Sequence, residues 1–374
     1  MKLLAVVPTG ELSGAERVLL RYLGAAAEAG VHVRCLVPPG RCADALAAAG
    51  ITTLPLPALD VPTGPRAVGL ARLAGRWRAA ARAVRAAAVD ADAVLVNGFL
   101  ALPAVRMARI APPVAWLVHD VVRKPEWRLL MRVCAPAVTT AFAVSDGAAG
   151  PVRAAGIPAR VVRNGTVWPV EPARPGPGVP VVGVNAALTS WKGQDVLLEA
   201  VARLDVPVHV ELMGGRFAKD APFADALRER AARPDLAGRV RFVGHVADPL
   251  ARMRTWTVAV SSSVGPEAAP LNVLEAMSIG LPMVATGHGG TVEVLGGAGL
   301  LVPPGDPAAL AAALRRLLTE PDLHARCAAA GPTAVAAGLR LEDAVEDFLL
   351  ALASLTPPTP PARRPAPVAT EELV

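Results

Sequence analysis

Two glutamates stand eight positions apart in the segment 261–286, with a proline and a short apolar run between them. The residues before Glu267 are apolar or β-branched and predict a buried strand, whereas Pro270 favours the first turn of a helix. Glu275 would then lie one turn inside that helix, and a glycine and a proline would end it before a strand at 283–286. The segment therefore predicts a strand, a loop, a helix and a strand, with one carboxylate in the loop and one in the helix.

This arrangement suits a phosphate group with hydroxyl-bearing groups on both sides. The first amides of such a helix, at Leu271 and Asn272, have no partner within the helix and lie at the positive end of its dipole. Glu275 could accept hydrogen bonds from hydroxyls on one side of the phosphate, and Glu267 from hydroxyls on the other. A nucleotide diphosphate-sugar has ribose on one side and sugar on the other. The alternative is that both glutamates are solvated, since charged side chains are mostly exposed.

The segment resembles the donor-site motif of the family 4 retaining glycosyltransferases, which have the two-domain GT-B fold. The resemblance implies that Glu267 acts at the transferred sugar and that Glu275 binds the ribose. The family's loop is usually rich in glycine, whereas this chain has two alanines and Pro270 after Glu267. Glycines let a ligand approach the backbone closely, and proline has no N–H to donate. We therefore expect this chain to depart from the family in the sugar half of the site more than in the nucleotide half.

The composition describes a globular chain with room for two domains. It has 374 residues, of which 53% are hydrophobic and 19% charged, and it has no apolar run long enough to span a membrane. The four cysteines lack the spacing of zinc ligands, and Met1 leads into an expected strand without a signal peptide, which predicts a cytoplasmic protein with reduced thiols. The net charge of +6 is too mild to indicate nucleic acid and is compatible with acidic ligands or a membrane surface.

Strands and helices alternate along both halves of the chain, which predicts two α/β domains, each a doubly wound, Rossmann-like parallel sheet. Ligands of such sheets bind at the carboxyl ends of the strands. The resemblance implies that these two domains face each other across a cleft. The strands expected in the first half cover 3–8, 31–37, 51–54, 94–97, 114–118 and 139–145, and those in the second half cover 179–184, 208–213, 240–244, 258–261, 283–286 and 300–302.

Two candidates lie at the expected strand ends of the first half. The loop at 9–16 resembles the family's glycine loop, which closes over the donor phosphates, and this makes Gly14 a donor-binding candidate. His119 follows the strand at 114–118, where the family commonly has a histidine near the transferring sugar. A single histidine is more often structural. The resemblance implies a role for His119 at the reaction centre.

The second half contains a Lys192-Gly193 pair that resembles the family's donor loop. There Lys192 would neutralise the donor diphosphate as a point charge. The family usually has an arginine five residues before that lysine, where this chain has Ala187. Either another arginine takes its place, with Arg163 and Arg216 as candidates, or diphosphate binding is weaker.

The strand at 240–244 ends in a segment that resembles the part of the family's site whose backbone meets the nucleotide base. This makes Gly244, His245 and Val246 donor-binding candidates, and the alternative is an ordinary core strand. The turn at 300–307 also resembles the family's and is expected to be structural.

The sequence predicts that the chain is divided into five parts. An acceptor-side domain covers 1–170, and a linker rich in proline and glycine covers 171–180. The nucleotide-sugar-binding domain covers 181–337, and a helix at 338–355 would cross back to the first domain. The proline-rich residues 356–374 are expected to form a disordered tail.

The stretch 69–88 predicts an amphipathic helix with apolar side chains on one face and arginines on the other. One explanation is a surface helix with a solvated face, and the alternative is docking on anionic lipid. Trp77 falls on the apolar face, which favours the first explanation. The apolar face has Leu70, Leu73, Trp77, Ala81 and Val84, and the basic face has Arg72, Arg76, Arg78, Arg82 and Arg85.

The sequence predicts a retaining, hexosyltransferase-type glycosyltransferase that moves a sugar from a UDP- or GDP-linked donor to an acceptor hydroxyl. The acceptor could be a glycan, a lipid or a small molecule, and nucleic acid is not expected. No Asp-x-Asp or histidine cluster indicates a metal site, so neither metal nor cofactor is expected beside the donor itself. Ala187 and the missing glycines leave two alternatives: a non-catalytic protein that binds nucleotide-sugar or glycan, and a hexose phosphorylase or epimerase of the same fold.

Overall fold

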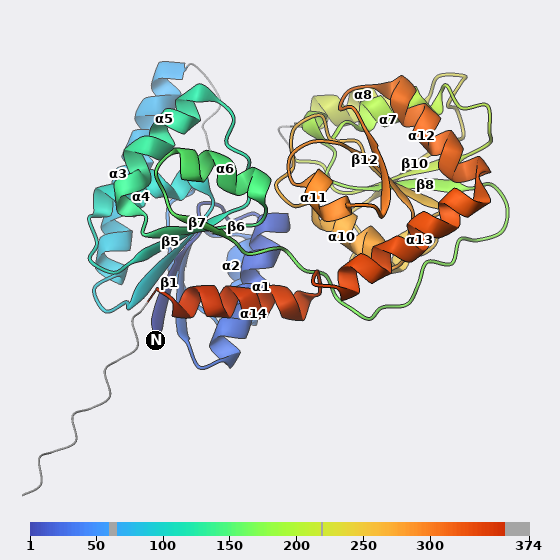
Figure 1. Cartoon of the computed structure of the whole chain (residues 1–374). Helices are drawn as coiled ribbons and strands as arrows, with labels where there is room; N and C mark the ends of the chain where they lie inside the picture. Colours follow the sequence, from blue (N-terminus) through green and yellow to red (C-terminus); the bar gives the residue numbers. More distant parts are fainter. Residues whose placement is uncertain (60–65, 218–219, 356–374) are drawn as a thin grey trace, which may run out of the picture.

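The computed structural model of the chain contains two parallel sheets with helices packed on their faces (Figure 1). The structure describes residues 1–59, 66–217 and 220–355. The tail expected at 356–374 lies outside the described residues, and so does the side chain of Leu70. Among the described residues, no helix combines the length and the apolar character needed to cross a bilayer.

The first sheet has seven parallel strands in the order β3-β2-β1-β4-β5-β6-β7. Its interior strands are continuous apolar runs, as expected for strands that are covered on both faces. The strands are β1 (Lys2–Val6), β2 (His32–Val37), β3 (Thr52–Pro55), β4 (Ala93–Asn97), β5 (Val114–Val118), β6 (Thr140–Ala143) and β7 (Ala159–Val161). The helices are α1 (Gly14–Glu28), α2 (Arg41–Ala48), α3 (Arg66–Ala87), α4 (Leu102–Ala108), α5 (Pro125–Cys134) and α6 (Asp146–Ala154).

The second sheet has six parallel strands in the order β10-β9-β8-β11-β12-β13. The strands are β8 (Val181–Asn185), β9 (His209–Met213), β10 (Val240–Gly244), β11 (Val258–Ser261), β12 (Met283–Thr286) and β13 (Gly299–Val302). The helices are α7 (Gln194–Val201), α8 (Ala221–Ala231), α9 (Pro249–Met253), α10 (Leu271–Ser278), α11 (Thr291–Leu295), α12 (Pro307–Thr319) and α13 (Pro321–Ala336). A short 3₁₀ turn, η3 (Ser190–Lys192), precedes α7.

The last helix, α14 (Leu341–Ala353), packs on the first domain although it follows the second domain in the chain (Figure 1). Phe348 of α14 stacks on Tyr22 of α1 with 4.4 Å between the ring centroids, and it meets Phe142 of β6 edge-on. Aromatic pairs of this kind add to the stabilisation that burial gives. The chain between β7 and β8, which includes the expected linker at 171–180, has no helix or strand.

The two places where the chain passes between the domains touch each other. Thr166 donates from its amide to the carbonyl of Leu339 at 3.0 Å and accepts from the amide of Leu341 at 2.8 Å. A Cβ atom on Gly165 would lie 2.3 Å from the carbonyl oxygen of Arg340, so only glycine allows the two passages to come this close. The two passages between the domains therefore lie side by side and are hydrogen-bonded to each other.

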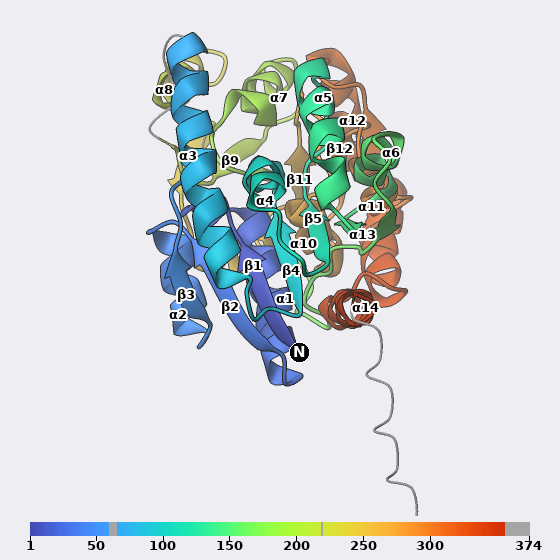
Figure 2. The same ribbon diagram turned by 90° about the vertical axis from the view of Figure 1, so that its left-hand side faces the viewer.

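The helix predicted at 69–88 is confirmed as part of α3, which lies on the side of the first domain facing away from the second (Figures 1 and 2). Leu73 and Val84 are buried, and the indole N–H of Trp77 donates to the carbonyl of Leu100 at 2.9 Å. Trp77 thus packs toward the core. Arg85 donates to the carbonyls of Ala108 and Met107 at 2.8 and 3.2 Å, so this arginine caps the end of α4.

Candidate functional site

The strand orders of the two sheets indicate where a ligand-binding site is expected. The order reverses between β1 and β4 in the first sheet and between β8 and β11 in the second. Loops at the carboxyl ends of strands diverge at such a point and leave a crevice in which ligands bind. Gly14 and Lys192 follow β1 and β8, and Glu267 follows β11. His119 directly follows β5, one strand beyond the reversal of the first sheet.

Lys192 and Glu267 form a buried ion pair. The ammonium nitrogen lies 2.7 Å from both carboxylate oxygens, and the two side chains are only 15% and 8% exposed. Ser263 donates to the same carboxylate at 2.5 Å, and the ring of Trp191 lies 4.1 Å from the ammonium. The alternative of a solvated Glu267 is therefore wrong. The structure also joins two residues that the sequence assigned to different parts of the donor.

Gly193 allows the ion pair to form. Its backbone has φ = +66°, and a Cβ atom there would lie 2.1 Å from the carbonyl oxygen of Ser262. The turn η3 can therefore lie directly on the loop after β11. Ser262 donates from its hydroxyl to the carbonyl of Lys192 at 3.0 Å, and Val264 donates from its amide to the carbonyl of Trp191 at 2.9 Å.

Glu275 lies on α10 in a half-buried position and accepts a hydrogen bond from the amide of Asn185 at 3.0 Å. Burial raises the pKa of Glu275 to about 7, against the opposing effect of Arg21 and Arg17 on α1. The carboxyl group is therefore only partly ionised at neutral pH. The two arginines come from the first domain, so Glu275 faces the space between the domains.

Gly14, Leu271 and Asn272 meet where the two domains approach each other. A Cβ atom on Gly14 would lie 3.7 Å from the side chain of Leu271, so the loop after β1 reaches the first turn of α10. That helix follows Pro270, and its first amides, at Leu271 and Asn272, have no acceptor within the helix. The structure thus brings together the three residues expected at the phosphates.

His119 is connected to the loop after β1 by a buried polar chain. Its Nε2 lies 3.0 Å from Oδ1 of Asn97, and the amide of Asn97 donates to Glu16 at 3.2 Å. Glu16 also accepts from the backbone amide of Ser13 at 3.2 Å and from its hydroxyl at 2.5 Å. Burial lowers the pKa of His119 to about 4, so its imidazole is neutral near pH 7.

The sequence did not identify Asn97 or Glu16 as site residues. Asn97 is a polar residue at the end of an apolar strand, and Glu16 stands three positions after Ser13, the spacing of a helix capping box. Both signals are present in the sequence, but each has an ordinary structural explanation. Their connection to His119 appears only when β1, β4 and β5 lie side by side.

The residues expected at the base lie at the outer edge of the second sheet. Gly244 ends β10 with φ = +78°, and its carbonyl accepts from the amide of Gly214 at 2.8 Å. His245 is exposed and Val246 half-buried. These three residues are at the same end of the sheet as Lys192 but two strands away from β8. Their role in binding the base stays a prediction.

Two arginines could replace the arginine that the family usually has at the position of Ala187, and they lie in different places. Arg216 follows Gly215, whose carbonyl accepts from the amide of Leu188 at 2.9 Å, so its backbone lies beside the loop of Ala187. Its side chain contacts Asp225 at 3.4 Å and is exposed. Arg163 is exposed at the crossing between the domains. Arg216 is the better placed of the two.

The loop that carries Glu267 is also held by the first domain. Asn164 donates from its amide to the carbonyl of Ala269 at 2.9 Å. Glu293, on α11, accepts from the backbone amides of Asp146 and Gly147 at 2.9 and 2.8 Å, at the start of α6. A carboxylate at that helix end is stabilised by the helix dipole. The two domains are therefore in contact through this loop and through α11.

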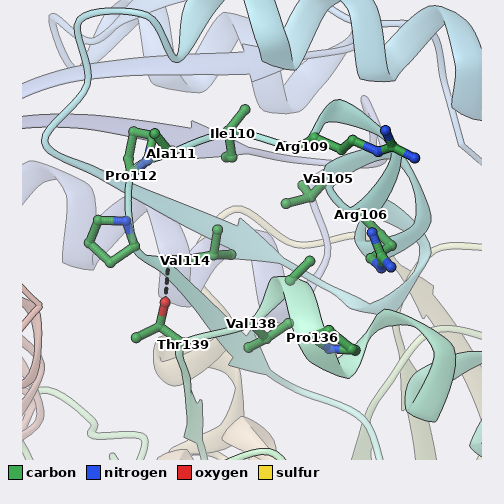
Figure 3. Close-up of a pocket in the computed structure, with 12 residues that line it drawn as sticks. Val105, Arg106, Arg109, Ile110, Ala111, Pro112, Val114, Pro136, Val138 and Thr139 are labelled. Atoms are coloured by element: carbon green, nitrogen blue, oxygen red, sulfur yellow. Dashed lines mark hydrogen bonds between the residues drawn. The ribbon is translucent and has the colours of Figure 1, made fainter.

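A separate cavity of 410 Å³ lies at the opposite end of the first sheet (Figure 3). It is lined by Arg106 and Arg109 and by residues at the amino ends of β5 and β6, such as Val114 and Thr139. None of the candidate residues lines it. In the described parts of the chain, no three His, Cys, Asp or Glu side chains are grouped in a way that could hold a metal ion.

Comparison with known proteins relates part of the chain to glycosyl transferases. Residues 179–320 match the family model described as Glycosyl transferases group 1. A D-inositol 3-phosphate glycosyltransferase of Corynebacterium urealyticum is 34% identical over 170 residues, and a phosphatidyl-myo-inositol mannosyltransferase of Mycobacterium leprae is 37% identical over 153 residues. Residues 179–320 therefore resemble the group 1 glycosyl transferases. The alignments cover 42% and 38% of this chain and 40% and 38% of the relatives, so the match spans about two fifths of each relative.

Solved structures show that this chain has the GT-B fold. HepE of Anabaena, in complex with UDP and glucose, has a TM-score of 0.80 at 23% identity, covering 95% of this chain and 100% of that chain. Sucrose-phosphate synthase of Thermosynechococcus elongatus has a TM-score of 0.78 at 20% identity, covering 95% and 99%. Identities this low show the fold alone. The fold class predicted from the sequence, two Rossmann-like domains that face each other, is confirmed.

If Glu275 binds the ribose, as the sequence predicts, donor binding should release protons near neutral pH. Ribose hydroxyls donate hydrogen bonds and favour the ionised carboxylate, whereas the pKa of about 7 leaves this group partly protonated in the free protein. Binding of UDP-glucose, whose phosphates do not titrate in this range, should therefore release a fraction of a proton and become tighter between about pH 6 and about pH 8. Calorimetric titration in buffers of different ionisation enthalpy measures this release.

The Glu275→Gln variant has no titrating group at this position and should show no release. Glu229→Gln, which removes an exposed carboxylate on α8, is the matched control and should behave like the wild type. Proton release that persists in Glu275→Gln would show that another group contacts the ribose.

Proposed function

We propose that this protein is a retaining glycosyltransferase that transfers a hexosyl group from a UDP- or GDP-linked sugar to an acceptor hydroxyl. The observation that carries the proposal is the buried pair of Lys192 and Glu267 beside the first turn of α10. A buried cation next to free backbone amides is suited to a diphosphate, and the adjacent carboxylate is suited to sugar hydroxyls. The match of residues 179–320 to the group 1 glycosyl transferases and the GT-B fold agree with this chemistry.

In the proposed complex, the diphosphate lies at the amides of Leu271 and Asn272, with the ribose toward Glu275 and the sugar toward Glu267 and His119. The ammonium of Lys192 then moves from the carboxylate to the phosphates. The bond between the anomeric carbon and the phosphate oxygen breaks as the acceptor oxygen attacks from the same face. The leaving phosphate takes the acceptor's proton, so no side chain needs to act as a nucleophile. Catalysis comes from positioning and from stabilising the charge on the departing diphosphate.

A non-catalytic protein that binds nucleotide-sugar is the second candidate, and the loop after Glu267 favours it. Ala268 and Pro270 stand where the family usually has glycines, and both are buried. The carbonyl of Ala268 lies so close to Gly290 that a Cβ atom there would be 1.6 Å away. The loop is thus packed tightly against Gly290 and cannot move in that direction. Any extra space for the sugar has to lie on the opposite side of the loop, toward the cleft between the domains.

The release of free nucleotide from a panel of UDP- and GDP-linked sugars separates the two candidates. A transferase without its acceptor usually transfers slowly to water, so at least one donor should give nucleotide above the blank. Lys192→Met should lower this turnover by roughly 10²–10³-fold, the cost of one lost group at the developing charge. Lys2→Met, at the amino end of β1, is the matched control. A donor that binds but is never hydrolysed or transferred would support the binding protein instead.

We further propose that the first domain docks on the anionic, cytoplasmic face of a membrane and takes a lipid acceptor there. Residues 66–139 contain 12 of the 38 basic residues and only four of the 32 acidic ones, so the rest of the chain carries a slight negative excess. Leu129 and Val133, one turn apart on α5, are 64% and 57% exposed. An excess of basic side chains and exposed apolar side chains in one domain are both features of proteins that bind anionic lipid. One relative's name, phosphatidyl-myo-inositol mannosyltransferase, refers to such a lipid.

Co-sedimentation with vesicles of phosphatidylglycerol and phosphatidylcholine tests the docking. Arg72, Arg78 and Arg82 are exposed on α3, and their joint replacement by glutamine should lower the bound fraction at low salt. Arg85 is left in place because it caps α4. The control replaces Arg315, Arg316 and Arg326 of α12 and α13, which changes the net charge equally. A wild-type protein that stays in the supernatant at low salt would contradict the proposal.

A further inference from the structure

We propose that Glu16 and Asn97 are positioning residues that hold His119 in a single tautomer, with the proton on Nε2 and the lone pair on Nδ1. The inference rests on the proposed function in one respect, namely that His119 faces the transferred sugar. The tautomer itself follows from hydrogen bonds within the first domain. The bonds run from Glu16 through Asn97 to His119 at 3.2 and 3.0 Å.

The direction of each hydrogen bond follows from the carboxylate at one end. An ionised carboxylate has only acceptors, so Asn97 has to turn its NH₂ group toward Glu16. The carbonyl oxygen of Asn97 then faces His119. A carbonyl oxygen also only accepts, so Nε2 of His119 has to be the nitrogen that carries the proton. Reversing the asparagine would place an oxygen against the carboxylate and an N–H against the imidazole N–H.

Burial makes this arrangement hard to reverse. Asn97 is 1% exposed and Glu16 is 5% exposed, so water cannot replace a lost partner at low cost. Burial also lowers the pKa of His119, which keeps the imidazole neutral. A neutral imidazole with Nε2–H offers Nδ1 as an acceptor. His119 can therefore accept a hydrogen bond from a hydroxyl of the sugar or of the acceptor, which an imidazolium could not do.

The same carboxylate connects His119 to the donor loop. The other oxygen of Glu16 accepts from the amide and hydroxyl of Ser13, directly before Gly14. The loop conformation and the histidine tautomer thus depend on one buried charge. Two further titratable groups face that charge: burial and then Glu16 raise the pKa of Asp120, and burial and then Glu16 raise the pKa of the Cys42 thiol to about 12. The Cys42 thiol beside Glu16 is therefore neutral near pH 7.

Nitrogen-15 NMR of histidine-labelled protein tests the tautomer without any substrate, and a His119→Gln variant identifies the signal of His119. The wild type should show a protonated Nε2 and an unprotonated Nδ1 near pH 7. Glu16→Gln is nearly isosteric but has both a donor and an acceptor, so Asn97 can turn and a mixture of tautomers should appear. The double variant Glu16→Gln, Asn97→Asp pairs the new amide with one oxygen of the new carboxylate and leaves the other oxygen to accept from Nε2. It should restore the Nε2–H tautomer and raise the pKa of His119, because the new carboxylate favours the imidazolium.

A protonated Nδ1 in the wild type, or an unchanged single tautomer in Glu16→Gln, would overturn the proposal. Kinetics with a turned-over donor give a second readout. Glu16→Gln should lower kcat with little change in KM, and the double variant should restore turnover at high pH while moving the acidic limb of the pH profile upward. If the wild type turns over no donor, the proposed function fails, whereas the NMR result still decides the tautomer.

Discussion

The buried contact between Lys192 and Glu267 is the interaction on which the site depends. Removing two charges from water is costly, and a direct pair with additional hydrogen bonds offsets only part of that cost. The pair therefore requires a close approach of the turn η3 to the loop after β11, which Gly193 permits and Ser263 reinforces. A diphosphate that enters the site offers the ammonium a second anion. The ion pair in the free protein thus holds the cation in place until the donor arrives.

The loop of Glu267 also belongs to the contact between the domains. Its carbonyl groups accept from Asn164 of the first domain and, at Glu267 itself, from the amide of Gly290 at 2.8 Å. Glu293, on α11, also connects the second domain to the start of α6. Any change in the angle between the domains would move the backbone that carries the carboxylate of Glu267. Donor groups on both domains are consistent with a site that is complete only when the domains are close.

The sequence predicted the two sheets well because βαβ alternation and apolar strands are local patterns. It placed the strands before the site loops to within a few residues, although β7 at Ala159–Val161 was not predicted. The contact of Lys192 with Glu267 could not be predicted, since 75 positions separate the two residues and each resembles a different part of the family motif. Asn97 and Glu16 were missed because a strand end and a capping box already explained them. Long-range contacts of this kind exist only after the strand order is known.

The affinity of the Glu267→Gln variant for bare UDP and bare GDP tests the central claim most directly. If Glu267 competes with the diphosphate for Lys192, the neutral variant should have several times the wild-type affinity for whichever nucleotide the wild type binds. The gain in binding free energy should be less than about 3 kcal/mol, the upper value for one charged hydrogen bond. The same variant should gain nothing once Lys192 is also replaced by methionine, because the competition is then absent. Weaker binding of the bare nucleotide by Glu267→Gln, or an equal gain in the double variant, would contradict the account.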